Sequence, residues 1–203
     1  MSFLDIAALS LHDIKNRLAA MASRAESRGD SDTLRDALAA AADLTRLLAL
    51  YKADAGILHT EIDACCPLDL LGELQRENQP LTGLEIVVDG ARAPQLWFYD
   101  PYLVRMLVLD AVQNALRFAR QRITLSAVEN GDCLEFRVSD DGAGFPEEIL
   151  RGQTHTSRVG PEGAGVGLYL AQRVAALHQN HGVAGGVALS NEPGAVFCLR
   201  LPR

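Results

Sequence analysis

Long apolar runs are missing from this chain of 203 residues, and no stretch approaches the roughly 18 apolar residues that a membrane-spanning helix needs. The first five residues, Met1 to Asp5, lack the basic start and apolar core of a signal peptide. Clustered basic charge is also missing, and the formal net charge is −7. Since phosphate backbones are held by clustered Lys and Arg, this charge argues against general nucleic-acid binding. We predict a cytoplasmic protein with no nucleic-acid partner and no membrane insertion.

Cysteine is scarce, and the four residues present show no spacing typical of metal ligands: Cys65, Cys66, Cys133 and Cys198. Two of them are adjacent in sequence and poorly placed to bridge each other. Reduced and mostly buried thiols in a cytoplasmic protein are the simplest interpretation. With 48% apolar residues, the chain has enough material for a packed core, in one ordinary domain or two small ones.

Before residue 60 the chain has no proline and only two glycines. This segment is rich in Ala and Leu, and its apolar residues alternate spacings of three and four, which predicts two long helices. We expect a break at 28–32, where Gly29 ends the first helix and Ser31 or Asp32 caps the second. The apolar seams run through these residues: Leu4, Ala7, Leu11, Ile14, Leu18, Met21 and Ala25, then Leu34, Ala37, Ala41, Leu44, Leu48, Tyr51, Ala55 and Leu58.

Two helices of this length form an antiparallel hairpin, which alone leaves part of each apolar stripe exposed. Pairing two hairpins across a two-fold axis gives a four-helix bundle and covers that surface. The sequence therefore predicts a homodimer.

From about residue 67 the chain alternates helices and strands. The patterns predict helices over 68–79, from Pro101 to about Arg120, from Pro146, and over 166–177. Strands are expected over 84–89, 122–128, 133–139, 187–190 and 196–201, several of them joined by hairpins. Strands interspersed with helices in this way indicate an α+β sandwich with an antiparallel or mixed sheet.

Two glycine clusters are the most informative feature of this part. The first, Asp140-Asp141-Gly142-Ala143-Gly144, opens with acidic residues, and the second, Gly163-Ala-Gly165-Val-Gly167-Leu168, leads directly into a helical pattern. A glycine loop at a helix N-terminus offers free N–H groups to phosphate oxygens. With the helix that carries Asn114 upstream, nucleotide binding is the leading hypothesis. Taken separately, each element has a plainer explanation as a turn, a flexible loop or a helix-surface residue.

His12 lies one position past the seam residue Leu11, which places it on the flank of the first helix. Asn16 is one turn further along the same face, and Asp13 is the sequence neighbour. An imidazole whose ring N–H is held by a carboxylate is a credible phosphoryl acceptor, although a solvated surface histidine fits the local pattern as well. His178 and His181 have no evident third metal ligand, and we interpret them as a helix end and a loop.

The segment His12-Asp-Ile-Lys-Asn-Arg-Leu18 resembles the phosphoacceptor box of two-component sensor histidine kinases. Residues 110–119 resemble their N box, 140–144 their first glycine box and 163–168 their second, in the family's order. The resemblance implies a Bergerat-type α/β sandwich ATPase domain at 63–203, behind a dimerisation and phosphotransfer hairpin at 1–62.

The resemblance also implies roles for single residues. ATP and Mg²⁺ would be the cofactors, with Asn114 as a metal ligand and Asp110 beside it. Asp140 would accept the exocyclic amine of adenine, while Gly142 and Gly144 let the backbone pass close to the base. The remaining nucleotide contacts would come from the phosphate-binding residues Arg117, Gly163, Gly165, Gly167 and Leu168.

In the phosphoacceptor box, His12 would attack the γ-phosphorus and Asp13 would orient it or act as a base. Asn16 would help to position water for dephosphorylation of a response regulator, the expected partner. Three features differ from the family pattern. Arg17 stands at the usual proline, Asp110 replaces an Asn, and no Phe follows Phe145 before the second glycine box.

We expect no input domain before the hairpin, so a separate sensor or activator protein, a phosphorelay role or a longer parent protein are all open. The first hypothesis is an ATP-dependent protein histidine kinase that phosphorylates His12 and passes the group to an Asp of a response regulator. The alternative is an ATP-independent histidine phosphotransferase or adaptor of the same architecture. A Ser/Thr kinase of the anti-sigma type ranks third, because it leaves the hairpin and His12 unexplained.

Overall fold

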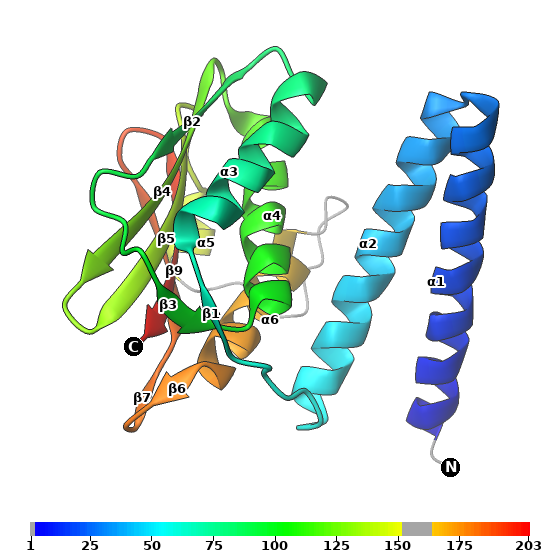
Figure 1. Cartoon of the computed structure of the whole chain (residues 1–203), viewed down its shortest axis with the longest axis horizontal. Helices are drawn as coiled ribbons and strands as arrows, with labels where there is room; N and C mark the ends of the chain where they lie inside the picture. The colour runs from blue at the N-terminus through cyan, green and yellow to red at the C-terminus, as the bar shows by residue number, and fades with distance from the viewer. Residues whose placement is uncertain (1–2, 152–163) are drawn as a thin grey trace. The chain divides into compact units, whose positions relative to one another are not determined.

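The computed structural model describes residues 3–151 and 164–203, and the chain divides into two compact units, Met1–Leu58 and His59–Arg203. The first unit consists of helices α1 (Phe3–Arg28) and α2 (Ser31–Asp54), as predicted (Figure 1). Gly29 ends α1 with a φ of 69°. The predicted cap at Ser31 or Asp32 is wrong, because the carboxylate of Asp30 accepts the Thr33 N–H at 3.1 Å and Ser31 is already helical.

The seam between α1 and α2 is lined by small side chains, which lets the two helices lie close together. Its buried residues are Ala22, Ala25, Ala37, Ala49 and Ala53. Larger apolar side chains of the same helices stay exposed, at fractions between 44% and 55%: Ile14, Met21, Leu38 and Leu47. A single hairpin thus leaves apolar surface uncovered, and the predicted dimer stays a prediction.

The second unit is built on a five-stranded sheet in the order β2-β4-β5-β9-β8. β2 runs parallel to β4 and all other neighbours are antiparallel, so the predicted mixed sheet is confirmed. Its strands are β2 (Glu85–Asp89), β4 (Arg122–Asn130), β5 (Cys133–Asp140), β8 (Gly186–Asn191) and β9 (Ala195–Pro202). One face is covered by α3 (Pro67–Asn78), α4 (Pro101–Phe118) and α6 (Ala164–Leu177), and α5 (Glu147–Leu150) is a single turn (Figure 1).

The core lies between the sheet and these helices. Alternate residues of β4 and β5 face it, which is the period-two pattern of a half-covered sheet. The fully buried set includes Ile123, Leu125, Leu134 and Phe136 from the strands, and Leu71, Val104, Val108, Val112 and Val174 from the helices. The last residue of β5, Asp140, pairs with Ile123 and therefore also points to the helical side of the sheet.

Two small ribbons were not predicted. β1 (Asp63–Cys65) pairs with β3 (Trp97–Tyr99), and β6 (Gln179–Asn180) pairs with β7 (Val183–Ala184). Strands of two or three residues are too short to show a period-two pattern, so the sequence offers no signal for them. A 3₁₀ turn (Gln79–Leu81) follows α3.

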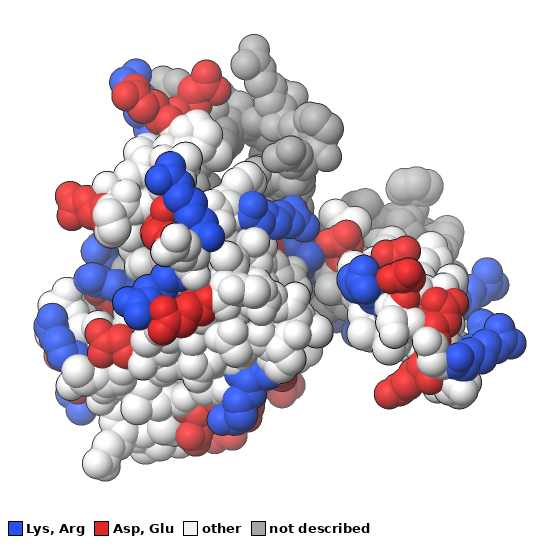
Figure 2. All heavy atoms as spheres, turned by 90° about the horizontal axis from the view of Figure 1, so that it is seen from above, with Lys and Arg blue, Asp and Glu red and all other residues white. Residues whose placement is uncertain are grey.

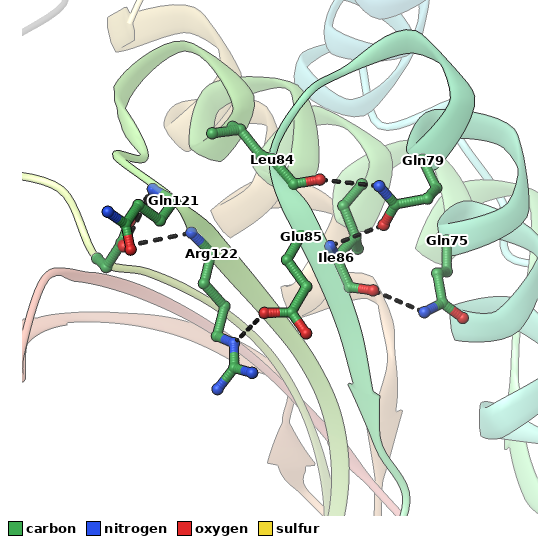
Figure 3. Close-up of polar contacts among 8 residues, drawn as sticks. Gln75, Gln79, Leu84, Glu85, Ile86, Gln121 and Arg122 are labelled. Atoms are coloured by element: carbon green, nitrogen blue, oxygen red, sulfur yellow. Dashed lines mark hydrogen bonds and ion pairs between the residues drawn. The ribbon is translucent and has the colours of Figure 1, made fainter.

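Side-chain amides fasten α3 to the edge strand β2 (Figure 3). Gln79 accepts the Ile86 N–H and donates to the Leu84 carbonyl, each at 2.8 Å, and Gln75 donates to the Ile86 carbonyl at 2.6 Å. At the same end of the sheet, the Arg122 Nε lies 2.8 Å from the Glu85 carboxylate. The hydrogen bonds of Gln75 and Gln79 satisfy backbone groups that an edge strand otherwise leaves open.

The surface carries charges of both signs in small groups on the face seen in Figure 2. No helix in the described part of the chain is both long and apolar enough to cross a membrane. All four cysteines are free thiols, with Cys198 buried and the other three partly buried.

His178 directly follows the end of α6 and lies buried, with 3% of its surface exposed. Its Nε2 accepts the Asp100 N–H at 3.1 Å, and its Nδ1 lies 3.0 Å from the Val174 carbonyl, so the proton resides on Nδ1. The Asp100 carboxylate caps α4 by accepting the Leu103 N–H and binds the Glu61 N–H with its other oxygen. The interpretation of His178 as a helix end is confirmed, and His181 lies in the β6–β7 turn with a φ of 47°.

Burial lowers the pKa of His178 below its ordinary value of 6.5, although the Asp100 carboxylate acts in the opposite direction. Because the unfolded chain then takes up the proton first, the chain should lose stability as the pH falls through 6.5 toward the lower folded pKa. Urea unfolding between pH 8 and pH 5 measures this loss. The His178→Gln variant should be less stable at pH 8, and its free energy of unfolding should change less with pH. The His181→Ala variant should keep the wild-type dependence of the free energy of unfolding on pH. Equal slopes for wild type and His178→Gln would contradict the assignment.

Candidate nucleotide-binding site

The loop 140–145 leaves the end of β5 and begins with a buried carboxylate. Asp140 is only 7% exposed, and its Oδ1 accepts the Gly142 N–H at 2.7 Å and the Ala195 N–H at 3.3 Å. Within residues 3–151 and 164–203, its Oδ2 accepts no hydrogen bond that the geometry supports. The side chain is therefore held rigidly by one oxygen, and the other is left to bind a donor.

Gly142 and Gly194 let three backbone segments meet beside Asp140. A Cβ on Gly142 would lie 2.4 Å from the Phe118 carbonyl oxygen, and one on Gly194 would lie 2.2 Å from the Asp140 carbonyl oxygen. Real Cβ atoms do not approach so closely. The protein's own packing thus already requires these glycines, in addition to any close approach of a base.

The far end of the loop is held by Asn191, the last residue of β8. Its Oδ1 accepts the Phe145 N–H at 2.7 Å and its Nδ2 donates to the Phe145 carbonyl at 2.9 Å. Gly144, with a φ of 85°, lies against the same side chain, since its Cβ would be 2.7 Å from the Asn191 Cγ. The loop is therefore fixed at both ends.

Helix α4 presents Asp110, Asn114 and Arg117 at positions i, i+4 and i+7, which share one face. Asn114 is half-buried and Arg117 is exposed. The first turns of α6 approach this face, because a Cβ on Gly167 would lie 2.4 Å from the Asp110 Oδ2.

Two segments therefore converge on α4. The glycine loop touches it at Phe118 and α6 touches it at Asp110, so Asn114 lies about 6 Å along the helix axis from each contact. Gly165 and Leu168 lie in the first turns of α6, and Gly163 is outside the described residues. The structure thus brings three features together: the buried carboxylate of the glycine loop, an amide and a carboxylate on one face of α4, and the first turns of α6.

This arrangement agrees with comparison to known proteins. The family described as "Histidine kinase-, DNA gyrase B-, and HSP90-like ATPase" matches residues 99–203, more than half of the chain. The chain belongs to this ATPase family.

Its relatives include sensor histidine kinases. The sensor-type histidine kinase PrrB of Mycobacterium leprae is 29% identical in an alignment 216 positions long. This alignment covers 97% of this chain and 47% of that protein. The signal transduction histidine-protein kinase AfsQ2 of Streptomyces coelicolor is 31% identical over 112 residues, which cover 51% of this chain and 20% of that protein. The chain thus spans less than half the length of these curated relatives.

Solved structures show the same fold. Full-length ShkA, crystallised with AMPPNP, superposes with a TM-score of 0.76 at 20% identity, covering 99% of this chain and 46% of that one. The ATP-binding domain of PrrB from Mycobacterium tuberculosis gives a TM-score of 0.56 at 25% identity, covering 70% of this chain and 96% of that one. Together with the sequence matches, they show that the chain is similar to the catalytic domains of histidine kinases.

In this ATPase family member, the α4 residues suit a magnesium ion. Asn114 and Asp110 offer an amide and a carboxylate oxygen one turn apart, the hard ligands that Mg²⁺ prefers. Few protein ligands are needed, since Mg²⁺ keeps several waters and binds substrate phosphates. Accordingly, the absence of any cluster of three His, Cys, Asp or Glu residues within the described ranges is no obstacle.

The predicted phosphoacceptor residues lie in the other unit. His12 belongs to α1, but its side chain is outside the described part of the structure. Asp13 and Asn16 are exposed on α1, and the helix continues without interruption through Arg17, where the family pattern has proline.

No role was predicted from the sequence for three residues in or near the glycine loop. Asn191 fixes Phe145, Asp141 binds backbone amides described below, and Phe118 exposes 59% of its surface at the end of α4. An aromatic residue four positions after Asn114 is a signal that could have drawn attention to Phe118. Nothing in the local sequence marks Asn191.

Proposed function

We propose that the chain is the catalytic core of an ATP-dependent protein histidine kinase that autophosphorylates His12 and transfers the phosphoryl group to an Asp of a response regulator. The observation that carries this proposal is the meeting of Asp140, the α4 face and the first turns of α6 in one ATPase domain. The same chain supplies an exposed helix that carries the His12 box.

The base end of ATP would bind at the glycine loop. The open Oδ2 of Asp140 would accept a charge-assisted hydrogen bond from the exocyclic amine on C6 of adenine, where guanine has a carbonyl oxygen that cannot donate. Phe118 offers an exposed aromatic surface at the same end of α4. Two fixed N–H groups on Oδ1 keep the carboxylate oriented before ATP arrives.

The phosphate end would lie along α4 toward α6. Arg117 would neutralise phosphate charge, and Gly165, Gly167 and Leu168 lie in the first turns of α6, whose N–H groups favour anions. Gly163, which precedes them in the sequence, is proposed to contact the phosphates as well. Asn114 and Asp110 would hold Mg²⁺, which would compensate part of the negative charge of the phosphates. The residues of this chain thus position and compensate charge, which is most of what phosphoryl transfer requires.

At the acceptor, a ring nitrogen of neutral His12 forms the new bond to the γ-phosphorus while the bond to the ADP oxygen breaks. Asp13 holds the proton on the other ring nitrogen. Asn16, one turn away on the same helix, positions water when the regulator is dephosphorylated. These roles follow from the family resemblance and from the exposure of Asp13 and Asn16.

The functional protein would be a cytoplasmic homodimer with two functional domains, 1–62 and 63–203. The exposed apolar residues Ile14, Met21, Leu38 and Leu47 favour burial of the hairpin against a second copy. The signal would come from a separate sensor or activator protein, or from another part of a longer parent protein.

Incubation of the purified chain with γ-labelled ATP and Mg²⁺ tests the proposal. We expect a protein label that is labile to acid and stable to base, and EDTA should prevent it. Asn114→Ala should lower labelling roughly 10- to 100-fold by removing a metal and phosphate contact, while Gln113→Ala, at the preceding residue of α4, should not. Absence of ATP binding by calorimetry would instead favour an ATP-independent phosphotransferase, and an acid-stable label would exclude histidine as the acceptor.

A further inference from the structure

The second aspartate of the glycine loop, Asp141, has no assigned role, yet it binds the connection that follows α4. Its Oδ1 accepts the N–H groups of Arg120 at 2.7 Å and Gln121 at 3.1 Å. Its Oδ2 accepts those of Gln121 at 3.1 Å and Arg122 at 3.2 Å. One carboxylate thus holds three successive backbone amides.

These amides lie where α4 has ended and β4 begins. The helix ends at Phe118, and Ala119 makes the last helical bond, to the Ala115 carbonyl. Figure 3 shows Gln121 and Arg122 at the start of β4, beside the Arg122–Glu85 ion pair. The backbone hydrogen bonds lower the pKa of Asp141, chiefly the one from Gln121, so the carboxylate is ionised at neutral pH.

Asp140 and Asp141 therefore face different parts of the domain. Asp140 points into the helical side of the sheet, toward the base site, and Asp141 reaches to the end of α4. Beside them, Gly142 packs directly on the Phe118 carbonyl. The glycine loop is consequently joined to the α4–β4 connection by the three amides that Asp141 binds, and to the end of α4 by one close backbone contact.

We propose that Asp141 is a positioning residue that fixes the distance between the two halves of the nucleotide site. One half is the base-binding carboxylate of Asp140, and the other is the α4 face with Asn114 and Arg117. A single ATP molecule must contact both halves, so its binding affinity depends on the distance between them. The affinity of a ligand that occupies only one half does not depend on that distance. This inference rests on the proposed ATP site.

The test compares Asp141→Ala with wild type, using a non-hydrolysable ATP analogue, adenosine and Mg²⁺-pyrophosphate as separate ligands. The analogue should bind on the order of 10- to 100-fold more weakly to the variant, as expected when charge-assisted bonds that hold a site are lost. The affinities for adenosine and for pyrophosphate, measured by ligand NMR, should each change by no more than about 3-fold, because each half of the site remains intact. Asp141→Asn, which keeps the shape and one acceptor oxygen, should give an intermediate affinity for the analogue.

Asp89→Ala is the matched control, since the Asp89 carboxylate accepts the Ala91 N–H at 3.1 Å at the far end of β2. It should leave all three affinities unchanged. All variants are measured at a temperature where circular dichroism shows them folded. Unchanged analogue binding by Asp141→Ala, or equal weakening of analogue and adenosine, would overturn the positioning role. Failure of wild type to bind the analogue would instead overturn the proposed function, and the inference with it.

Discussion

The His12→Ala variant is expected to carry no phosphoryl label after incubation with γ-labelled ATP and Mg²⁺, while it binds ATP as the unaltered chain does. Alanine has no ring nitrogen, so the bond to the γ-phosphorus cannot form. Nucleotide affinity should stay within about 2-fold, because His12 belongs to none of the three segments that build the nucleotide site. Labelling by autoradiography and affinity by calorimetry on the same preparation separate the two effects.

His59→Ala provides the control, since it removes an exposed histidine that lies outside the phosphoacceptor box. It should label at the wild-type level. Transfer is then followed by adding a receiver domain, to which labelled wild-type chain should lose its phosphoryl group. A label that persists in His12→Ala would show that the acceptor lies elsewhere.

Gly142→Ala is expected to give the second largest effect, on stability and on ATP binding together. The new Cβ would lie 2.4 Å from the Phe118 carbonyl oxygen and 2.8 Å from the Asp140 Oδ1. Both neighbours are held in place, so the loop must shift, at a cost of about 1–3 kcal/mol in the free energy of unfolding. The same shift displaces the Asp140 carboxylate, whose Oδ1 also accepts the Gly142 N–H.

Urea unfolding and titration with an ATP analogue measure the two losses. Gly83→Ala is the appropriate comparison, because its Cβ would meet nothing within 4 Å and its backbone needs no positive φ. It should change stability by no more than about 0.5 kcal/mol. Wild-type affinity in a destabilised Gly142→Ala would show that the loop tolerates the shift.

Much of the fold could be predicted because its elements have long, regular patterns. The spacing of three and four located α1 and α2, Pro101 marked the start of α4, and the predicted strands 122–128 and 133–139 located the hairpin of β4 and β5. The cap of α2 was misplaced by one or two residues, because the adjacent Asp30, Ser31 and Asp32 are equally good caps by type. Which of them bonds the Thr33 N–H depends on where Gly29 turns the chain.

The residues of the site were predictable by type, and their partners were not. Asp140, Asn114 and the glycines stand in ordered motifs, and the structure brings Asp140, Gly142 and Gly144 together in one loop beside α4. Nothing in the local sequence marks Asn191, and the glycine cluster that contains Asp141 does not reveal what Asp141 binds, because these contacts join segments 46 and about 20 residues apart in the chain. A hydrogen bond of this kind leaves no periodic trace in sequence.

The sequence by itself determined the helical first part and the α/β second part of the chain. It also determined the glycine clusters and the chemistry of the candidate residues, because these depend on local spacing and side-chain type. Only the tertiary structure decided why Gly142 and Gly194 must lack a Cβ, which oxygen of Asp140 is open, and what Asp141 and Asn191 hold. These properties depend on distances between strands and helices that are remote in sequence. Such distances are set by packing of the whole core and not by any local pattern.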